Sequence, residues 1–142
     1  MTTLMKAKEQ LESGGYTCVL TDGTAVYTST LRGVRPLVQF LRSGNISAGF
    51  SAADKVIGKA TAYLYVLLEV REIYAQIISE PAVRVLEANG IHVQYGQIVP
   101  NIINRKDDGI CPFEAAVMEI ADPESAYDAI LRKMGEMNIP IE

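Results

Sequence analysis

The residues best suited to chemistry gather at the start of a long, mostly apolar stretch at residues 51–71. Asp54, Lys55 and Lys59 lie within six residues of one another, next to Gly58. The apolar residues that follow recur at helical spacing, so we expect the whole stretch to be one buried helix. A helix start offers free N–H groups and a partial positive charge, and two lysines would add to it. The pattern predicts a site for a phosphate or carboxylate, with Gly58 allowing the ligand close to the backbone.

The same residues also have structural interpretations. Ser51 and Asp54 have the spacing of a capping box, which would explain Asp54 by itself. Lys55 and Lys59 lie one helical turn apart and would both be solvated if they faced outward. A Lys59 that faced inward would instead be a candidate nucleophile or base. Both interpretations are open at this point.

A second expected helix start lies at Ser79, Glu80 and Pro81. Ser79 has the position of an N-cap, and proline is tolerated in the first turn of a helix. Glu80 would then lie where a carboxylate interacts favourably with the helix dipole. Capping is the structural interpretation of Ser79, and ligand binding is the functional one.

A third expected helix start combines Cys111, Pro112 and Glu114. A cysteine at a helix start is more reactive than an ordinary one, and Glu114 could exchange a proton beside it. Packing against the core is the alternative for Cys111.

Other polar residues are less specific. Asn104 and Arg105, at the end of an expected strand, could bind an anion or form a salt bridge at a turn. Cys18 falls in a hairpin strand and is expected to be a packing residue. His92 is the sole histidine and is expected to be structural.

The elements that must position these residues alternate between helix and strand. A turn at Asp22–Gly23 joins the first two strands as a hairpin. The central order of helix, strand, helix, strand predicts parallel pairing through right-handed crossovers, with helices on both faces. We therefore expect a three-layer α/β/α fold with a mixed sheet of about five strands. The expected helices are 3–13, 35–44, 51–71, 79–89, one from 112 and 123–137, and the expected strands are 16–21, 25–29, 72–78, 91–95 and 97–104.

Length and composition limit the functional classes. The 142 residues suit one domain, residues 1–142, and the 49% hydrophobic and 21% charged content is typical of a soluble globular protein. A net charge of −4 and the lack of a dense basic run argue against nucleic acid as a partner. The apolar run 60–68 is too short to cross a membrane, so none is expected as a partner. With two distant cysteines and no visible secretion signal, a reduced cytoplasmic location is expected.

The order of a hairpin, a buried helix, a strand, a second helix and further strands resembles the cytidine deaminase-like fold. Zinc-dependent members carry a His/Cys-x-Glu motif at the start of the first core helix and a Pro-Cys-x-x-Cys motif at the start of the second. Here the first motif would fall near residues 54–59, where it is absent, and Ala82 and Val85 stand at the cysteine positions of the second. Zinc catalysis needs three protein ligands, so we expect no metal, no other cofactor and no zinc-dependent deamination.

Four short features are similar to a smaller, uncharacterised prokaryotic family that has this fold and lacks the zinc-binding motifs. They are the run DKVIGKA, a strand that ends in Ile-Ser, the pair Asn104–Arg105 and the sequence CPFE from Cys111. The resemblance spans roughly residues 10 to 135 and implies that the two core helix starts meet in one pocket. Ser79 and Glu80 would then join Asp54, Lys55, Gly58 and Lys59.

Two hypotheses follow. In the first, the chain binds a nucleotide or another small anionic ligand at the helix starts, with Arg105 as a further contact. If it is an enzyme, Lys59 or Cys111 would be the nucleophile and Asp54 or Glu114 the proton carrier. In the second, the chain is a catalytically inert interaction module. The run 60–68 has more apolar surface than one sheet face covers, so a homodimer or larger homo-oligomer would bury the rest.

Overall fold

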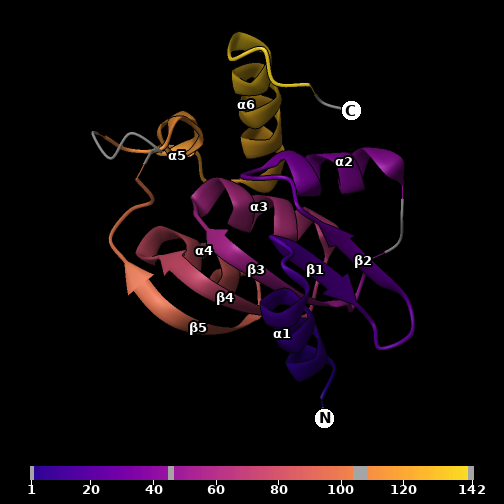
Figure 1. Cartoon of the computed structure of the whole chain (residues 1–142). Coiled ribbons are helices and arrows are strands. Elements are labelled where there is room, and N and C mark those ends of the chain that lie inside the picture. The colour runs from indigo at the N-terminus through magenta and orange to yellow at the C-terminus, as the bar shows by residue number, and fades with distance from the viewer. Residues whose placement is uncertain (1, 45–46, 104–108, 141–142) are drawn as a thin grey trace.

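A computed structural model of the chain describes residues 2–44, 47–103 and 109–140. It contains a five-stranded sheet with helices on both faces (Figure 1). The strand order is β2-β1-β3-β4-β5, with β3, β4 and β5 parallel and β1 antiparallel to both of its neighbours. The predicted mixed sheet and three-layer α/β/α arrangement are confirmed. The elements are α1 (Thr3–Gly14), β1 (Cys18–Thr21), β2 (Val26–Ser29), α2 (Arg35–Ser43), β3 (Ser51–Ile57), α3 (Lys59–Leu68), β4 (Glu72–Ser79), α4 (Glu80–Ala88), β5 (His92–Val99), α5 (Pro112–Val117) and α6 (Pro123–Glu136).

The two faces of the sheet bury different clusters. Among the described elements, α1 alone covers one face of β1, β3 and β4, where Leu4 and Leu11 pack against Val19, Ala53 and Tyr74. Helices α3 and α4 cover the other face, and α2 and α6 pack on the outer side of α3 (Figure 1). The larger core therefore lies on the α3 side.

The expectation of one helix over residues 51–71 is wrong in its first third. Residues Ser51–Ile57 form β3, a central strand paired with β1 and β4, and the helix begins only at Lys59. The first four residues of the strand are all buried, because α1 covers one face and α3 the other. Small residues such as Ala52 and Ala53 suit such a position but give no alternating pattern. Tertiary pairing therefore overrides the helical appearance of this segment.

The capping box of Ser51 and Asp54 is wrong for the same reason. Ser51 lies in the strand and its hydroxyl donates to the Glu72 carboxylate on the neighbouring strand. Residue Gly58 is the N-cap of α3 and makes no side-chain cap. Asp54 belongs to the interior of the sheet.

The apolar surface of α3 is covered by other helices of the same chain. Leu64 and Tyr65 are fully buried, and α2, α4 and α6 all pack against this helix. The surplus apolar surface that suggested an oligomer contact through this helix is therefore absent. An oligomer would need another surface.

Most of the remaining elements are confirmed. In the hairpin turn, an Asp22 carboxylate oxygen accepts from the N–H groups of Thr24 and Ala25, and Gly23 has a φ of +99°. The expected break between two late strands is wrong, because β5 is one strand that pairs with β4 in a single register from His92 to Val99. Pro100 follows directly, and Asn104 lies outside the described residues. No helix within the described ranges is long and apolar enough to cross a membrane.

Candidate functional site

Two helix starts lie next to each other at the carboxyl edge of the parallel strands. Ile57 at the end of β3 pairs with Ile78 on β4, and each strand passes at once into a helix. Gly58 precedes α3, and Ser79 caps α4 by accepting from the Ala82 N–H at 3.2 Å. Ser79 is fully buried, and its hydroxyl oxygen already serves the helix.

The start of α3 already holds an anion from the chain itself. A carboxylate oxygen of Glu114, on α5, accepts from the N–H of Ala60 at 3.1 Å, and the Glu114 side chain is buried. A Cβ placed on Gly58 would come within 2.6 Å of this carboxylate. Gly58 therefore leaves the space in which Glu114 lies. The helix dipole favours the carboxylate here, as it would favour an external anion.

The two lysines of the predicted site do not face a shared pocket. The ammonium group of Lys59 donates to the main-chain carbonyl of Met118 at 2.9 Å and lies 5.8 Å from the ring centroid of Tyr63. The contact ties α3 to the end of α5. Lys55 is exposed in β3. Of the two arrangements left open for Lys59, the geometry shows a half-buried side chain whose ammonium group is held by a main-chain carbonyl.

The other predicted residues are spread along the same edge. Glu80 is exposed in the first turn of α4. Cys111 is half-buried at the N-cap of α5, makes no side-chain cap and packs on the core. Asn104 and Arg105 lie outside the described residues. In the part of the chain that is described, no group of three His, Cys, Asp or Glu side chains is arranged to hold a metal.

A buried chain of polar groups, which the sequence did not indicate, connects β1, α3 and β3. The Tyr65 hydroxyl donates to a carboxylate oxygen of Asp54 at 2.7 Å and lies 3.3 Å from the sulfur of Cys18. Cys18 and Asp54 are direct partners in the antiparallel pairing of β1 with β3. All three side chains are at least 92% buried.

Burial dominates the acid–base behaviour of this chain. It raises the pKa of the Asp54 carboxyl from 3.8 to about 7, against the opposing effect of the hydrogen bond from Tyr65. Burial also raises the pKa of the Cys18 thiol, and the nearby Asp54 adds to this effect. The pKa of Tyr65 is raised by the same two causes. Near neutral pH Cys18 is therefore a neutral thiol.

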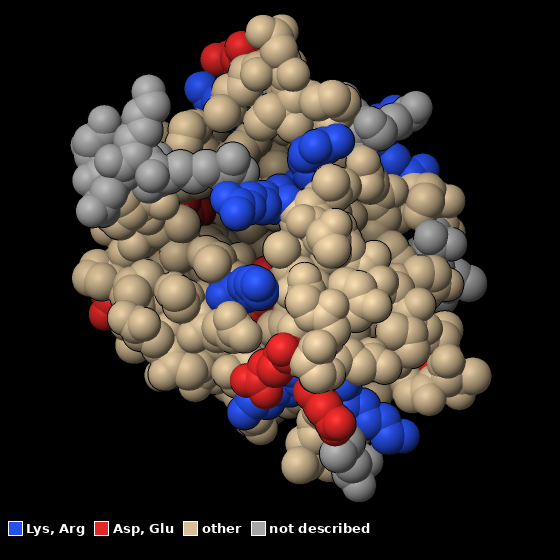
Figure 2. Space-filling view, in the orientation of Figure 1, with Lys and Arg blue, Asp and Glu red and all other residues tan. Residues whose placement is uncertain are grey.

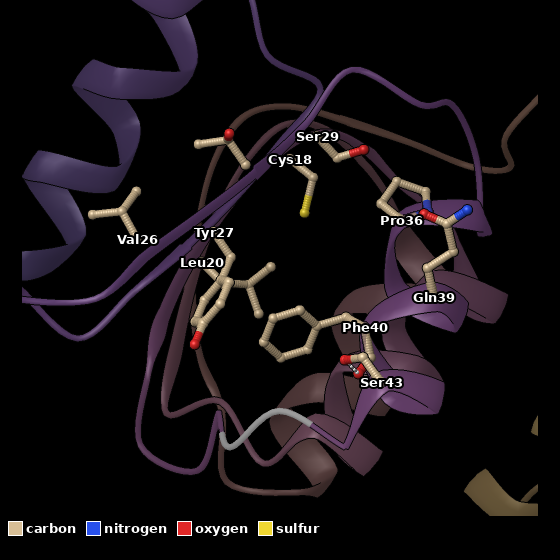
Figure 3. Close-up of a pocket in the computed structure, with 10 residues that line it drawn as sticks. Cys18, Leu20, Val26, Tyr27, Ser29, Pro36, Gln39, Phe40 and Ser43 are labelled. Atoms are coloured by element: carbon tan, nitrogen blue, oxygen red, sulfur yellow. Dashed lines mark hydrogen bonds between the residues drawn. The ribbon is translucent and has the colours of Figure 1, made fainter. Parts of the chain in front are cut away.

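Cys18 also forms the floor of an open hollow of about 380 Å³ between the β1–β2 hairpin and α2. Figure 3 shows Cys18 and Ser29 at one end and Phe40 and Ser43 at the other, with the Cys18 sulfur directed into the space. The rings of Tyr27 and Phe40 meet edge to face, with centroids 4.8 Å apart. The lining is Cys18, Leu20, Val26, Tyr27, Thr28, Ser29, Pro36, Gln39, Phe40 and Ser43, and none of these residues is charged.

The sequence offered one signal for this region. Gly58 separates two segments of different character, and a glycine at a strand-to-helix turn would have ended a strand at Ile57. That assignment would have placed Asp54 in a strand of the sheet and not at a helix start. Without it, Cys18 was expected only to pack and Tyr65 was one apolar position among many.

The fold and these contacts define an α/β domain with a mixed sheet and an uncharged hollow beside its hairpin. The start of its helix α3 is bonded by a carboxylate of the same chain. The chain belongs to the family described as "Domain of unknown function (DUF1893)", which matches residues 6–134. It is similar to a solved structure of a DUF1893 family protein, TM1506 from Thermotoga maritima, with 27% sequence identity and a TM-score of 0.86. That match covers 92% of this chain and 89% of the other. No match was found among curated proteins.

The contact between Glu114 and Gly58 predicts coupled effects on stability. Glu114→Ala leaves the Ala60 N–H without its partner and should cost about 1–2 kcal/mol. Gly58→Ala should cost a similar amount, because its methyl group would displace the carboxylate; Gly58 is extended, so its backbone accepts alanine. The double variant should cost little more than either single one, as measured by urea denaturation. Simple addition of the two costs would contradict this contact.

The buried Asp54 predicts a dependence of stability on pH. A carboxyl group whose pKa is higher in the folded than in the unfolded state favours folding below the unfolded value, and this contribution is lost as pH rises through the folded value. The wild-type free energy of unfolding should therefore fall between about pH 4 and pH 7.5, by at most about 4 kcal/mol. Asp54→Asn keeps an acceptor for Tyr65 and should not show this decrease. The measurement is urea denaturation of both proteins from pH 4 to pH 8. If their free energies of unfolding changed with pH in the same way, Asp54 would not be a buried acid.

Proposed function

We propose that the chain binds a small molecule with a planar, uncharged ring, of the nucleoside or nucleotide class, in the hollow between the β1–β2 hairpin and α2. The observation that carries this proposal is the hollow itself, which has about 380 Å³ and is lined by aromatic, aliphatic and uncharged polar side chains. Small-molecule sites have this composition, with a few polar groups that orient the ligand. The volume suits one ring system better than a large cofactor.

Two kinds of side chain in the lining could bind a planar ligand: aromatic rings for its face and polar groups for its edge. Tyr27 and Phe40 present ring surfaces on which a planar heterocycle can stack, and such contacts tolerate many ring types. The hydroxyl of Ser29 and the amide of Gln39 can donate to or accept from the edge of the ring. Because the Cys18 thiol is neutral, it adds a polarisable surface at the floor rather than a charge.

A positively charged residue, Arg35, stands next to the hollow at the start of α2. Figure 2 shows Lys and Arg side chains across the middle of the face that carries α2 and α3, although the net charge of the chain is −4. Arg35 directly precedes the lining residue Pro36, and its buried Nε has no hydrogen-bond partner among the described residues. An anionic group near the start of α2 would interact favourably with this guanidinium.

The structure also changes which two helices of this chain would correspond to the core helices of the deaminase-like fold. With β3 recognised as a strand, the order of hairpin, helix, strand, helix is met by α2, β3 and α3, so the two helix starts are those of α2 and α3. Neither start has the zinc motifs: the first reads VRPL and the second GKAT. The element order supports a deaminase-like fold, and the hollow lies beside the start of α2. The hypothesis of an anion at the starts of α3 and α4 is less favoured, because Glu114 occupies the first and Ser79 caps the second.

The proposal is tested by titrating purified protein with nucleobases, nucleosides and nucleotides in a calorimeter. We expect saturable binding at one site for at least one of these compounds. Gln39→Trp should weaken it at least tenfold, because the indole would fill part of the hollow. Arg42→Trp is the matched control, since Arg42 lies on the same helix and outside the lining, and it should bind as the wild type does.

Lys59→Ala separates the hollow from the helix-start site. The hollow predicts unchanged binding in this variant, because Lys59 is bonded to Met118 and does not line the hollow. Loss of binding in Lys59→Ala, with Gln39→Trp unaffected, would move the ligand to the helix starts. Absence of saturable binding for every compound would reject the proposal.

A further inference from the structure

We infer that two copies of this chain associate through their β5 strands, paired antiparallel around a two-fold axis at Gly96. Strand β5 is one edge of the sheet, whereas the hairpin and its hollow lie at the opposite edge. The inference is therefore independent of the proposed ligand and uses a surface that no contact described above occupies.

The backbone of β5 offers an unused row of hydrogen-bonding groups. The His92 N–H donates to the Arg71 carbonyl, so His92 directs its backbone groups toward β4. Alternate residues of a strand direct these groups to opposite sides. Val93, Tyr95, Gln97 and Val99 therefore direct theirs away from the sheet. No bond from these groups to another described residue replaces the missing neighbour strand.

This edge has none of the features with which monomeric proteins usually block edge-to-edge pairing. Strand β5 is eight residues long, and its sequence, HVQYGQIV, contains no Lys, Arg, Asp, Glu or Pro. Short edges, charged side chains, prolines and bulges are the usual protections. The other edge, β2, has only four residues. Tyr95 and Ile98 of β5 are also 45% and 42% exposed, which is high for side chains of their size.

A second copy is the partner that this edge fits. Two copies of a strand can always pair antiparallel across a two-fold axis, and such an interface is self-complementary. The strand carries no charged residue, so two chains of net charge −4 can approach here without placing like charges opposite one another.

One register uses all the outward groups. Opposed residues of an antiparallel pair must both direct their backbone groups toward the partner or both away from it. With Gly96 on the axis, Val93 lies opposite Val99 of the second copy, and Tyr95 lies opposite Gln97 of the second copy. The outward backbone groups of these four residues in one copy then bond to those of the same four residues in the second copy. The two β-branched pairs would also meet on one face of a continuous ten-stranded sheet.

Two variants with opposite charge patterns test this register. Tyr95→Lys/Gln97→Lys places like charges directly opposite each other twice, so the dimer should weaken at least tenfold. Tyr95→Lys/Gln97→Glu removes the same side chains but places opposite charges across the axis, so the dimer should persist. The measurement is sedimentation equilibrium, in which the wild type should show twice the 15.5 kDa mass of one chain. Circular dichroism confirms that both variants fold, which is expected because both positions are exposed.

The remaining outcomes overturn the inference. A wild type that stays monomeric at high micromolar concentration would show that the edge does not join two copies. A dimer that survives in both variants would lie on another surface. Loss of the dimer in both variants would exclude the register with Gly96 on the axis. The calorimetric test of the hollow is read separately in the same variants, so failure of one proposal does not decide the other.

Discussion

The hydrogen bond from Tyr65 to Asp54 is the interaction on which the arrangement of this domain depends. It joins the middle of α3 to the central strand β3, at the position where β3 pairs with Cys18 on β1. A carboxyl group in this place loses nearly all of its water, and an unpaired one would be strongly destabilising. Protonation and the Tyr65 hydroxyl together make the position tolerable. The same tyrosine hydroxyl also contacts the sulfur of Cys18, which lines the hollow.

The sequence predicted the class of the fold and most of its elements because their signals are local. The Asp22–Gly23 turn, the Ser79 cap and the proline helix starts each specify an element within a few residues. Strand β3 has no such signal. Its small residues are buried on both faces by elements far away in the sequence, so neither alternation nor β-branching reveals it. Missing this strand moved the expected start of the central helix from Lys59 to Ser51.

The candidate site was harder to predict than the fold, because a helix start does not reveal what already occupies it. Cys111 and Glu114 were correctly placed at a helix start, yet the carboxylate of Glu114 serves a different helix, α3. That bond joins residues more than fifty positions apart, and no spacing in the sequence reports it. Lys59 is similar, since its partner is a main-chain carbonyl. Sequence patterns identify groups able to bind a ligand, whereas packing decides which of them remain available.

These contacts give this DUF1893-family domain two separable regions. The edge at the ends of β3 and β4 is closed by side chains of the chain itself, and the hairpin side keeps an open, uncharged hollow above a neutral cysteine. The buried Asp54 is linked to that hollow through Tyr65, whose hydroxyl contacts both Asp54 and Cys18. This division explains why the proposed ligand site is next to α2 and not where the lysines are.

The most direct test of this account is the pKa of Asp54, measured by carbon-13 NMR of its carboxyl group across a pH titration. A carboxyl group buried in β3 beneath Tyr65 should titrate near pH 7. A midpoint below about pH 4.5, as for an exposed or helix-capping aspartate, would contradict the central position of Asp54 and the arrangement built on it.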